Sequence, residues 1–473
     1  MNGARLATAA LMAAALAGCA DMRGIQPTAQ LRDAAALGLP AGASLAVAPD
    51  WWTALGDAQL DRLVAQALAG NPRLRVAAAR VAKAQGAIEL AESARWPQVG
   101  AEFDLNRQHF SDNYIYPPPL GGSSRNLATL QLTGGWELDF FGKHQGALDA
   151  AIGRMRAAEA ESDAARVLLA ANVARAYVQW ARLEDQRDVA RRTLAQREQM
   201  LGLVQARAQA GLDNQLELRQ SETGRADTRA SLAALGQQID ASRNALAALL
   251  GQPRLPDGVQ PPHLAGLRTL AVPHELKADW LARRADISAA RWHVEAARGD
   301  VQVAKAQFYP DINLAAFLGF QAMGFGRLLE GGSLAWSVGP AIRLPIFEAG
   351  RLRGQLREKS ADVDAAIETY NATVIDAMRE VADQSQGLQA TARQQREQAQ
   401  ALHAAEGAYA IAERRWRAGL ATYLQVLATE SAVLTQRRQQ VDLAAQAYSS
   451  QIALAQAMGG GWQPTAAPAV TGH

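Results

Sequence analysis

The stretch LQLTGGWELDF, residues Leu130–Phe140, decides the fold. Its even positions hold Leu, Leu, Gly, Trp, Leu and Phe, whereas its odd positions hold Gln, Thr, Gly, Glu and Asp. This alternation predicts a β-strand with one apolar and one polar face. The strand leads directly into FGKHQGALDAAIG, where a long helix is predicted to begin, and a similar strand-to-helix junction, LPIFEAGR, recurs about two hundred residues later.

The chain of 473 residues contains two collinear copies of one plan. Pro97 aligns with Pro310 (310 − 97 = 213), and Gly142 aligns with Gly350 (350 − 142 = 208). Such self-similarity predicts an internal tandem repeat. We therefore expect a first repeat over 57–250 and a second over 274–460. They are separated by a linker rich in proline and glycine over 251–273, and a flexible tail follows over 461–473.

Each half is predicted to run helix, strand, loop, strand, long helix, turn and second long helix. The predicted strands are 99–108, 130–140, 312–322 and 334–346, with bends expected at Pro340 and Pro345 of the last one. No proline interrupts 144–210, and apolar residues there step by three and four, as at Val173, Tyr177 and Trp180. This spacing is typical of coiled coils. The helices that follow are predicted over about 213–250 and 422–458.

The N-terminus, MNGARLATAALMAAALAGCADM, has a basic residue, an apolar core and a small-residue cleavage site. These features predict a signal peptide over 1–18, and the site resembles the lipobox of lipoproteins. That resemblance implies N-palmitoyl and S-diacylglycerol groups on Cys19, the first residue of an anchored segment over 19–56. Ala20 follows the cysteine, which by the same resemblance favours the outer membrane. The alternative is an ordinary signal peptide with a chance cysteine.

No other stretch approaches the roughly 18 consecutive apolar residues of a membrane helix. The predicted strands, in contrast, are about as long as strands that cross an outer membrane. Four strands cannot close a barrel, because the smallest known barrels use about eight. Copies of the chain must then pool their strands: two chains would give eight and three would give twelve, with a lumen. The charged helices would project into the periplasm. A soluble, half-buried antiparallel sheet would show the same alternation.

The lipobox, the repeat, the junctions WELDFFGK and LPIFEAGR, and RAGL before the final helix resemble the TolC-like outer membrane factors. The likeness is greatest to their lipidated, OprM/NodT-like branch and covers essentially the whole mature chain. It implies an α+β membrane protein: a homotrimer with a twelve-stranded outer-membrane barrel continued by a periplasmic coiled-coil barrel. It also implies a periplasmic adaptor (membrane fusion protein) and an inner-membrane RND-type pump as partners, and passive export of drugs, toxic organics or metals.

The same resemblance suggests which residues act at the periplasmic tip. Acidic residues about six and nine positions after the turn glycine form a constriction in the family. Counted from Gly419, those places hold Gln425 and Ala428, so this chain departs from the pattern. Leu424 matches a leucine that narrows the tip. We expect a hydrophobic and polar gate, although Leu424 as a core residue is an equal alternative and Glu430 is the nearest acid.

Two further tip features follow from the resemblance. Trp416 is expected to hold neighbouring helices together, with ordinary packing as the alternative. Gly211 and Gly419 are expected to end helices where the adaptor docks.

Enzyme chemistry finds little support in the sequence. The seven histidines are scattered, without the spacing of a metal site, and the glycine-rich GFGRLLEGG lacks the lysine of a phosphate loop. We therefore expect no catalytic residue, no metal and no cofactor besides the lipid. A formal net charge of +2 predicts no large nucleic-acid surface, so no nucleic-acid partner is expected.

Two functions compete with solute efflux. One is protein export as the outer-membrane part of type I secretion, because the same architecture serves both. The other is a lipid-anchored periplasmic coiled-coil scaffold without a pore.

Overall fold

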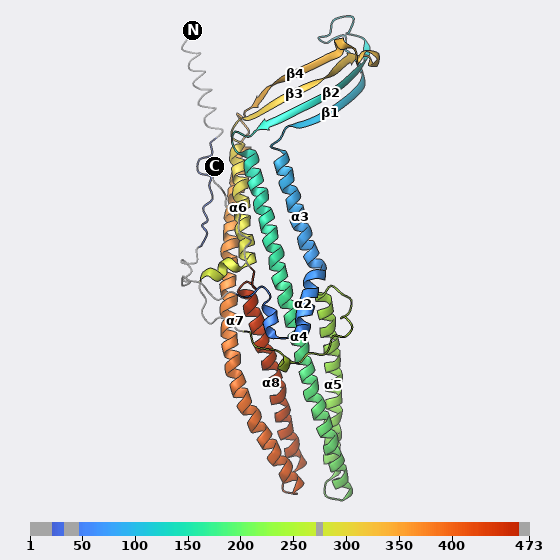
Figure 1. Ribbon diagram of the computed structural model, residues 1–473, viewed down its shortest axis with the longest axis vertical. Coiled ribbons are helices and arrows are strands. Elements are labelled where there is room, and N and C mark those ends of the chain that lie inside the picture. Colours follow the sequence, from blue (N-terminus) through green and yellow to red (C-terminus); the bar gives the residue numbers. More distant parts are fainter. Residues whose placement is uncertain (1–20, 33–46, 271–277, 463–473) are drawn as a thin grey trace. The chain divides into compact units, whose positions relative to one another are not determined.

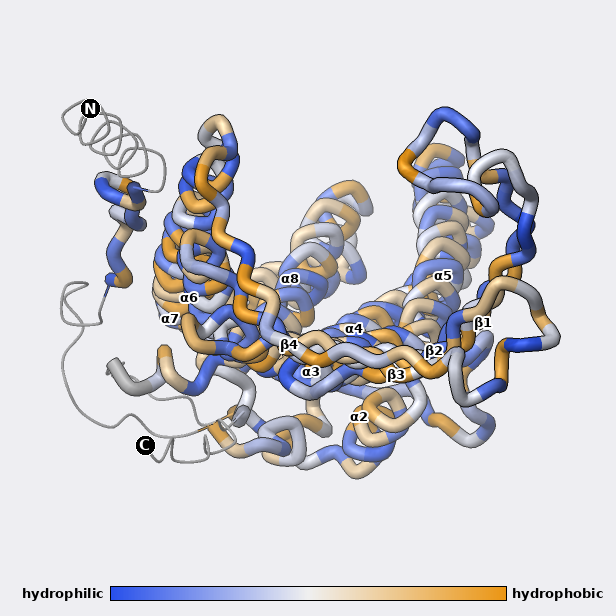
Figure 2. The backbone as a smooth tube through the Cα atoms, turned by 90° about the horizontal axis from the view of Figure 1, so that it is seen from above, coloured by the Kyte–Doolittle hydropathy of each residue, from blue (hydrophilic) through white to orange (hydrophobic). Residues whose placement is uncertain are grey.

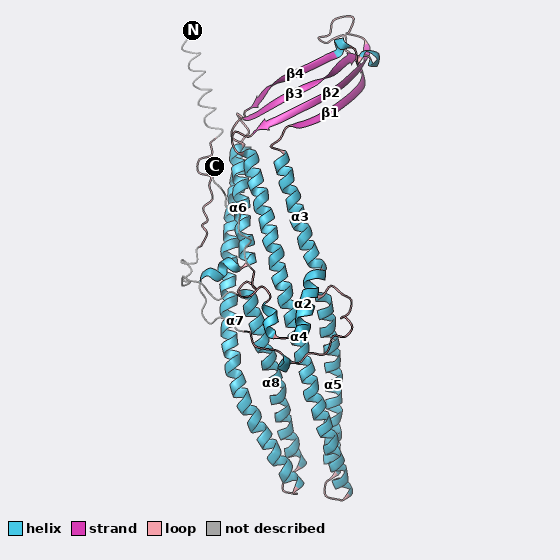
Figure 3. Cartoon of the chain, in the orientation of Figure 1, coloured by secondary structure: helices cyan, strands magenta, loops and turns pink. Residues whose placement is uncertain are grey.

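A computed structural model of the chain describes residues 21–32, 47–270 and 278–462. Cys19 and the signal peptide lie outside the described residues. Helices and one antiparallel sheet make up the described chain (Figures 1 and 3). The helices and strands are, in chain order, η1 (Trp51–Leu55), α2 (Ala58–Gly70), α3 (Pro72–Ser93), β1 (Gln98–His109), β2 (Ser124–Leu138), α4 (Lys143–Gln209), α5 (Gln215–Leu249), η2 (Leu264–Gly266), η3 (Ala278–Arg283), α6 (Ala285–Ala306), β3 (Asp311–Met323), η4 (Phe325–Arg327), η5 (Gly331–Ser333), β4 (Leu334–Arg343), α7 (Arg351–Arg417) and α8 (Tyr423–Ala457).

The chain divides into two compact units, and each unit draws on both halves of the sequence. The first comprises 1–31, 80–159 and 289–371, and it contains the sheet. The second comprises 32–79, 160–288 and 372–473. The long helices α4 and α7 contribute to both units, so the compact units differ from the consecutive repeats that the sequence suggests. The repeat boundaries therefore stay a prediction.

The sheet has the order β1-β2-β3-β4, with every neighbouring pair antiparallel. The register places Phe103 opposite Leu130, Leu130 opposite Phe320, and Phe320 opposite Leu334. Because opposed residues in an antiparallel pair share a face, the apolar positions of all four strands join into one face. Figure 2 shows apolar residues recurring along the strands with polar ones between them. Large apolar side chains on this face, such as Trp336, are exposed.

All four predicted strands are present, with small differences at their ends. β2 begins at Ser124, six residues before the predicted start at 130, because 124–129 pair with β1 and partly with β3. β4 ends at Arg343, so the predicted extension to 346 is wrong: Pro345 cannot donate to a ladder. Pro340 does lie within β4, which is an edge strand, where a missing N–H is tolerated.

The helices match their predicted positions closely. The uninterrupted run predicted over 144–210 is α4, and the predicted second helices of the hairpins are α5 and α8. Equivalent helices in the two halves have equal lengths: α3 and α6 have 22 residues each, α4 and α7 have 67, and α5 and α8 have 35. None of the helices in the described part of the chain is long and apolar enough to cross a membrane.

The core of the second unit surrounds Tyr177 and Trp180 of α4, which pack with apolar residues of α2, α5 and α8. Leu255 and Leu264 belong to this core, although they lie in the predicted linker over 251–273. Gly461 and Trp462, the first residues of the predicted tail, belong to the second unit and lie close to Ala48 and Asp163; residues 463–473 lie outside the described chain.

In the first unit, an extended N-terminal segment packs against α6 and α7. Ile25 joins a buried cluster with Val294 and Leu356. The carboxylate of Asp364 accepts hydrogen bonds from the backbone N–H groups of residues 28 and 29, both at 2.8 Å. These bonds, led by the one from residue 29, hold the pKa of Asp364 below its usual range. Asn371 and Arg353 of α7 also donate to backbone carbonyls of this segment, so several side chains of α7 hold it in place.

Candidate functional site

Two helical hairpins, α4–α5 and α7–α8, end in turns with the same geometry. Gly211 and Gly419 adopt left-handed conformations, with φ of +74° and +75°. In each turn the N–H after the glycine donates to a carbonyl five positions earlier, at 2.9 Å in the first and 2.8 Å in the second. This is the Schellman arrangement, which glycine favours because it has no Cβ. The chain therefore reverses at both glycines expected to end helices.

The turn of the first hairpin has more polar side-chain contacts than the turn of the second. Asn214 and Glu217 form a reciprocal capping box at the start of α5. Arg207 and Asp213 form an ion pair across the turn, with Nε and Oδ2 2.8 Å apart. Thr422, at the start of α8, makes no side-chain capping bond. The α7–α8 turn consequently has fewer polar contacts, and the packing of Trp416 on Tyr423 crosses it instead.

The residues expected to form a constriction lie on the exposed side of α8, just after the second turn. Leu424 is 61% exposed, and Gln425 and Ala428 are exposed as well. Their neighbours Tyr423 and Val426 are buried. Leu424 is therefore not a core residue of the single chain. An exposed strip with one large apolar and one amide side chain can narrow a passage without adding charge.

Trp416 lies on the opposite, buried side of this tip. It is 1% exposed and packs in a cluster with Met200 and Val204 of α4 and Tyr423 of α8. The guanidinium carbon of Arg207 lies 5.0 Å from the centre of its indole ring, within range of a cation–π interaction. Trp416 thus connects the two hairpins of one chain, and ordinary packing accounts for its position.

A polar network missed by the sequence reasoning connects the same hairpins further along. Arg197 of α4 donates to Glu430 of α8 at 3.0 Å. It also donates to the carbonyl of Gly224 at 2.6 Å and to the hydroxyl of Thr228 at 2.9 Å, both in α5. Glu430 is only 6% exposed. Within the chain, the nearest acid to the expected constriction is thus buried and bound by Arg197.

Two tyrosines add neutral contacts to this region. Gln196 of α4 donates to the hydroxyl of Tyr409 in α7. Burial, followed by the charge of Glu413, raises the pKa of Tyr409 to about 12. Burial also raises the pKa of Tyr423. Both hydroxyls therefore stay protonated at neutral pH, and their contacts do not respond to pH in that range.

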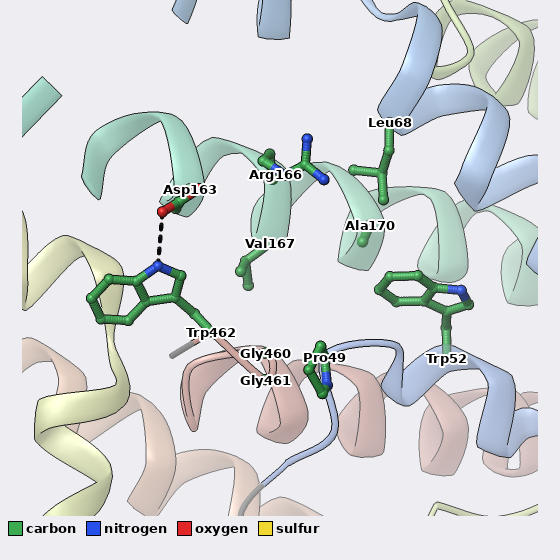
Figure 4. Close-up of a pocket in the computed structure, with 10 residues that line it drawn as sticks. All are labelled: Pro49, Trp52, Leu68, Asp163, Arg166, Val167, Ala170, Gly460, Gly461 and Trp462. Atoms are coloured by element: carbon green, nitrogen blue, oxygen red, sulfur yellow. Dashed lines mark hydrogen bonds between the residues drawn. The ribbon is translucent and has the colours of Figure 1, made fainter. Parts of the chain in front are cut away.

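No constellation suited to enzyme chemistry occurs among the described residues. Within them, no group of three or more His, Cys, Asp or Glu side chains could hold a metal ion. A cavity of about 350 Å³ lies in the second unit and is lined by Trp52, Arg166, Val167 and Trp462, among others (Figure 4). Trp462 Nε1 donates to Asp163 at 2.9 Å there. This hydrogen bond holds the last described residues of the chain against α4. The residues that line the cavity include no nucleophile and no acid–base pair.

Comparisons with known proteins agree on one family. The family model described as "Outer membrane efflux protein" matches residues 63–252 and 277–460. The chain is 38% identical to the fusaric acid resistance protein FusA of Burkholderia cepacia, over 74% of this chain and 68% of that protein. It is 32% identical to the multidrug resistance outer membrane protein MdtP of Shigella flexneri, over 89% of this chain and 87% of that protein.

A solved structure extends the agreement to the fold. The outer membrane protein VceC of Vibrio cholerae aligns with a TM-score of 0.82 and 37% identity, over 88% of this chain and 100% of that one. The family resemblance predicted from the sequence is thus confirmed. The chain belongs to the outer membrane efflux protein family, and it is an exit duct for efflux rather than an enzyme.

Proposed function

We propose that three copies of this chain form one outer-membrane duct, with twelve strands closing a barrel and the helices of each copy forming a periplasmic tunnel. The observation that carries the proposal is the four-stranded sheet with β1 and β4 as unpaired edges. In a membrane, every backbone N–H and C=O group must be paired, so open edges require partners. A β4 edge meeting the β1 edge of the next copy would close the ring by rotation.

The apolar face of the sheet supports a position in lipid. Val99, Phe103, Leu318, Val338 and Ile342 share this face by register and are all exposed. Polar groups such as Glu102, Gln131 and Ser337 occupy the opposite face. An apolar outside and a polar inside are the pattern of outer-membrane barrels with an aqueous lumen.

We further infer that the chain arose by duplication, so that each copy supplies two equivalent parts of the ring. The bounds of α4 and α7 differ by 208 at both ends (351 − 143 and 417 − 209). Those of α3 and α6 differ by 213 at both ends (285 − 72 and 306 − 93). Three copies of a duplicated chain would then approximate six-fold symmetry in the helical tunnel.

The substrates proposed are small organic molecules, expelled by an inner-membrane RND-type pump through a periplasmic adaptor. FusA is named for resistance to fusaric acid, and MdtP for multidrug resistance. The adaptor is proposed to dock around the turns at Gly211 and Gly419, and the lipid on Cys19 to anchor the chain in the outer membrane. Leu424 and Gln425, with Ala428 behind them, are proposed to narrow the periplasmic end.

Two measurements on the purified full-length protein test this function. Light scattering in detergent should give the mass of a trimer, and insertion into planar bilayers should give discrete conductance steps. A trimer without conductance would favour a scaffold instead of a duct. Export of a small fluorescent organic solute by cells carrying the chain with its pump would separate solute efflux from protein secretion.

A further inference from the structure

One face of α4 forms a wall of the cavity in the second unit. The wall comprises Asp163, Arg166, Val167 and Ala170, which are spaced so that they share one side of the helix (Figure 4). The cavity's volume of about 350 Å³ lies within the range of small-molecule sites. All of its lining residues belong to one unit of one chain, so the cavity does not depend on the assembly of copies.

Arg166 presents an uncommitted guanidinium to this cavity. It forms no hydrogen bond or ion pair with any residue in the described part of the chain. Asp163, one turn earlier, instead accepts the hydrogen bond from Trp462. The Arg166 side chain is exposed, so a molecule from solution can reach it. A guanidinium binds a carboxylate through two parallel N–H···O bonds, and a carboxylate is therefore the group that Arg166 fits.

Two indole rings border the cavity, and both are held in place. Figure 4 shows Trp52 and Trp462 at its two ends, with Arg166 between them. Trp52 packs edge-on against the buried ring of Trp51, with ring centres 5.9 Å apart. Trp462 is fixed by its bond to Asp163 at 2.9 Å. Aromatic walls that are already positioned favour a flat aromatic ligand, because stacking then requires little rearrangement.

The glycines before Trp462 allow its backbone to approach α4. Gly460 and Gly461 have φ of +56° and +77°, a region that side chains other than glycine rarely adopt. A Cβ added at Gly460 would also overlap a methyl group of Val167. The segment after α8 is thus shaped to place an indole beside the charged wall.

The other half of the chain shows which residues the repeated fold places at these positions. In the duplication inferred above, the offset of 208 makes Val374 the counterpart of Arg166 (374 − 166) and Asn371 the counterpart of Asp163 (371 − 163). Both counterparts are buried. Arg254 is the counterpart of Trp462 (462 − 254). The exposed guanidinium and the indole therefore occur in one half only, so the repeated fold does not require them.

We propose that this cavity binds a small aromatic monocarboxylate, with its carboxylate on Arg166 and its ring against the indoles of Trp52 and Trp462. The ligand carries one negative charge, because a second would be repelled by the carboxylate of Asp163 in the same wall. Bound there, it connects η1, α4 and the end of α8, and it stabilises the second unit. The site goes beyond the proposed duct, since it does not depend on the passage of solutes.

Calorimetric titration of the full-length protein in detergent tests the site, with 1-naphthoate as the probe. 1-Naphthalenemethanol has the same rings without the charge, and both probes partition into the same micelles for every variant. The wild type should bind 1-naphthoate saturably and at least about tenfold more tightly than the alcohol, because hydrogen bonds between charged groups are the stronger kind.

Variants at Arg166 separate its charge from its packing. Arg166→Gln should weaken binding of 1-naphthoate by at least about tenfold and leave that of the alcohol unchanged. Arg166→Lys, which keeps the charge without the planar fork, should restore part of the affinity. Arg192→Gln is the matched control, since Arg192 is an exposed arginine of α4 that does not line the cavity. Trp462→Leu should weaken both probes, because both stack on the indole.

The outcomes decide the proposal. The absence of saturable binding of 1-naphthoate would overturn it, and so would binding that Arg166→Gln leaves unchanged. Tighter binding of naphthalene-2,3-dicarboxylate than of 1-naphthoate would overturn the assignment of a monocarboxylate. None of these results bears on the trimer mass or the conductance, so the proposed function stands or falls separately.

Discussion

Replacing Arg197 with methionine should release α8 from the first hairpin near the tip. The guanidinium is the hydrogen-bonding partner of the Glu430 carboxylate, and its side chain is only 17% exposed. It also donates to Gly224 and Thr228 of α5. Methionine fills a similar volume but leaves the buried carboxylate without its cation. The perturbation therefore removes the ion pair while largely keeping the packing.

The expected cost follows from burial. Breaking a buried ion pair by removing one partner costs about 3–5 kcal/mol, because an uncompensated charge stays buried. An exposed pair contributes about 0–1 kcal/mol. Arg437 and Glu406 form such an exposed pair between α8 and α7, at 2.7 Å. Arg437→Met is the matched control, and it should cost only the about 0–1 kcal/mol of an exposed pair.

Amide hydrogen exchange along α8 is the assay, since it reports local opening segment by segment. A loss of about 3–5 kcal/mol corresponds to exchange faster by a factor on the order of 10²–10⁴ around Glu430. Adding Glu430→Leu to Arg197→Met should restore most of the protection, because an apolar pair of similar volume carries no buried charge. Equal, small changes for Arg197→Met and Arg437→Met would refute the reasoning that burial makes this pair strong.

Three further outcomes are expected. Leu424→Ser should raise the leak conductance in planar bilayers, whereas Leu212→Ser at the other turn should not; equal conductance would exclude Leu424 from the constriction. Asp364→Asn should speed amide exchange at residues 28–29. In the wild type, the amides of residues 28 and 29 should be fully protected from exchange above the ordinary carboxyl pKa. Their protection should fall as the pH drops through the lowered pKa of Asp364. Cys19→Ser should remove the acyl mass seen by mass spectrometry, and trimers should still form; their loss would show that the lipid is needed for assembly.

Much of the fold is predictable because it depends on local and periodic signals. Alternation with period two places the strands, and steps of three and four place the long helices. The glycines at 211 and 419 mark the turns because only a residue without a Cβ adopts their conformation easily. The end of β4 was missed because the apolar alternation continues past Arg343, whereas the ladder ends before Pro345.

The contacts between distant segments carry no such signal. Arg197 belongs to a helix rich in arginine, and nothing in its neighbours marks it as the one that meets Glu430, 233 positions away. Asp364 likewise binds residues 28 and 29, more than 330 positions earlier. These pairs depend on how helices pack, which periodicity alone does not determine. Charged residues at helical spacing therefore predict an exposed helix face. The few charged residues that are buried can be identified only once the packing of the helices is known.

The two hairpins are equivalent in the proposed duplication, but their side chains differ. Both turns keep the same glycine geometry, since any change there would alter the reversal of the chain. Their side chains have diverged: the first turn has the capping box of Asn214 and the Arg207–Asp213 pair, whereas Thr422 makes no capping bond at the second. At the turns themselves the first hairpin therefore has two polar contacts that the second lacks, whereas Trp416 packs on Tyr423 across the second turn, with ring centres 5.4 Å apart. Leu424 and Gln425 lie on the second, so the hairpin whose turn has fewer polar contacts is the one that carries the proposed constriction.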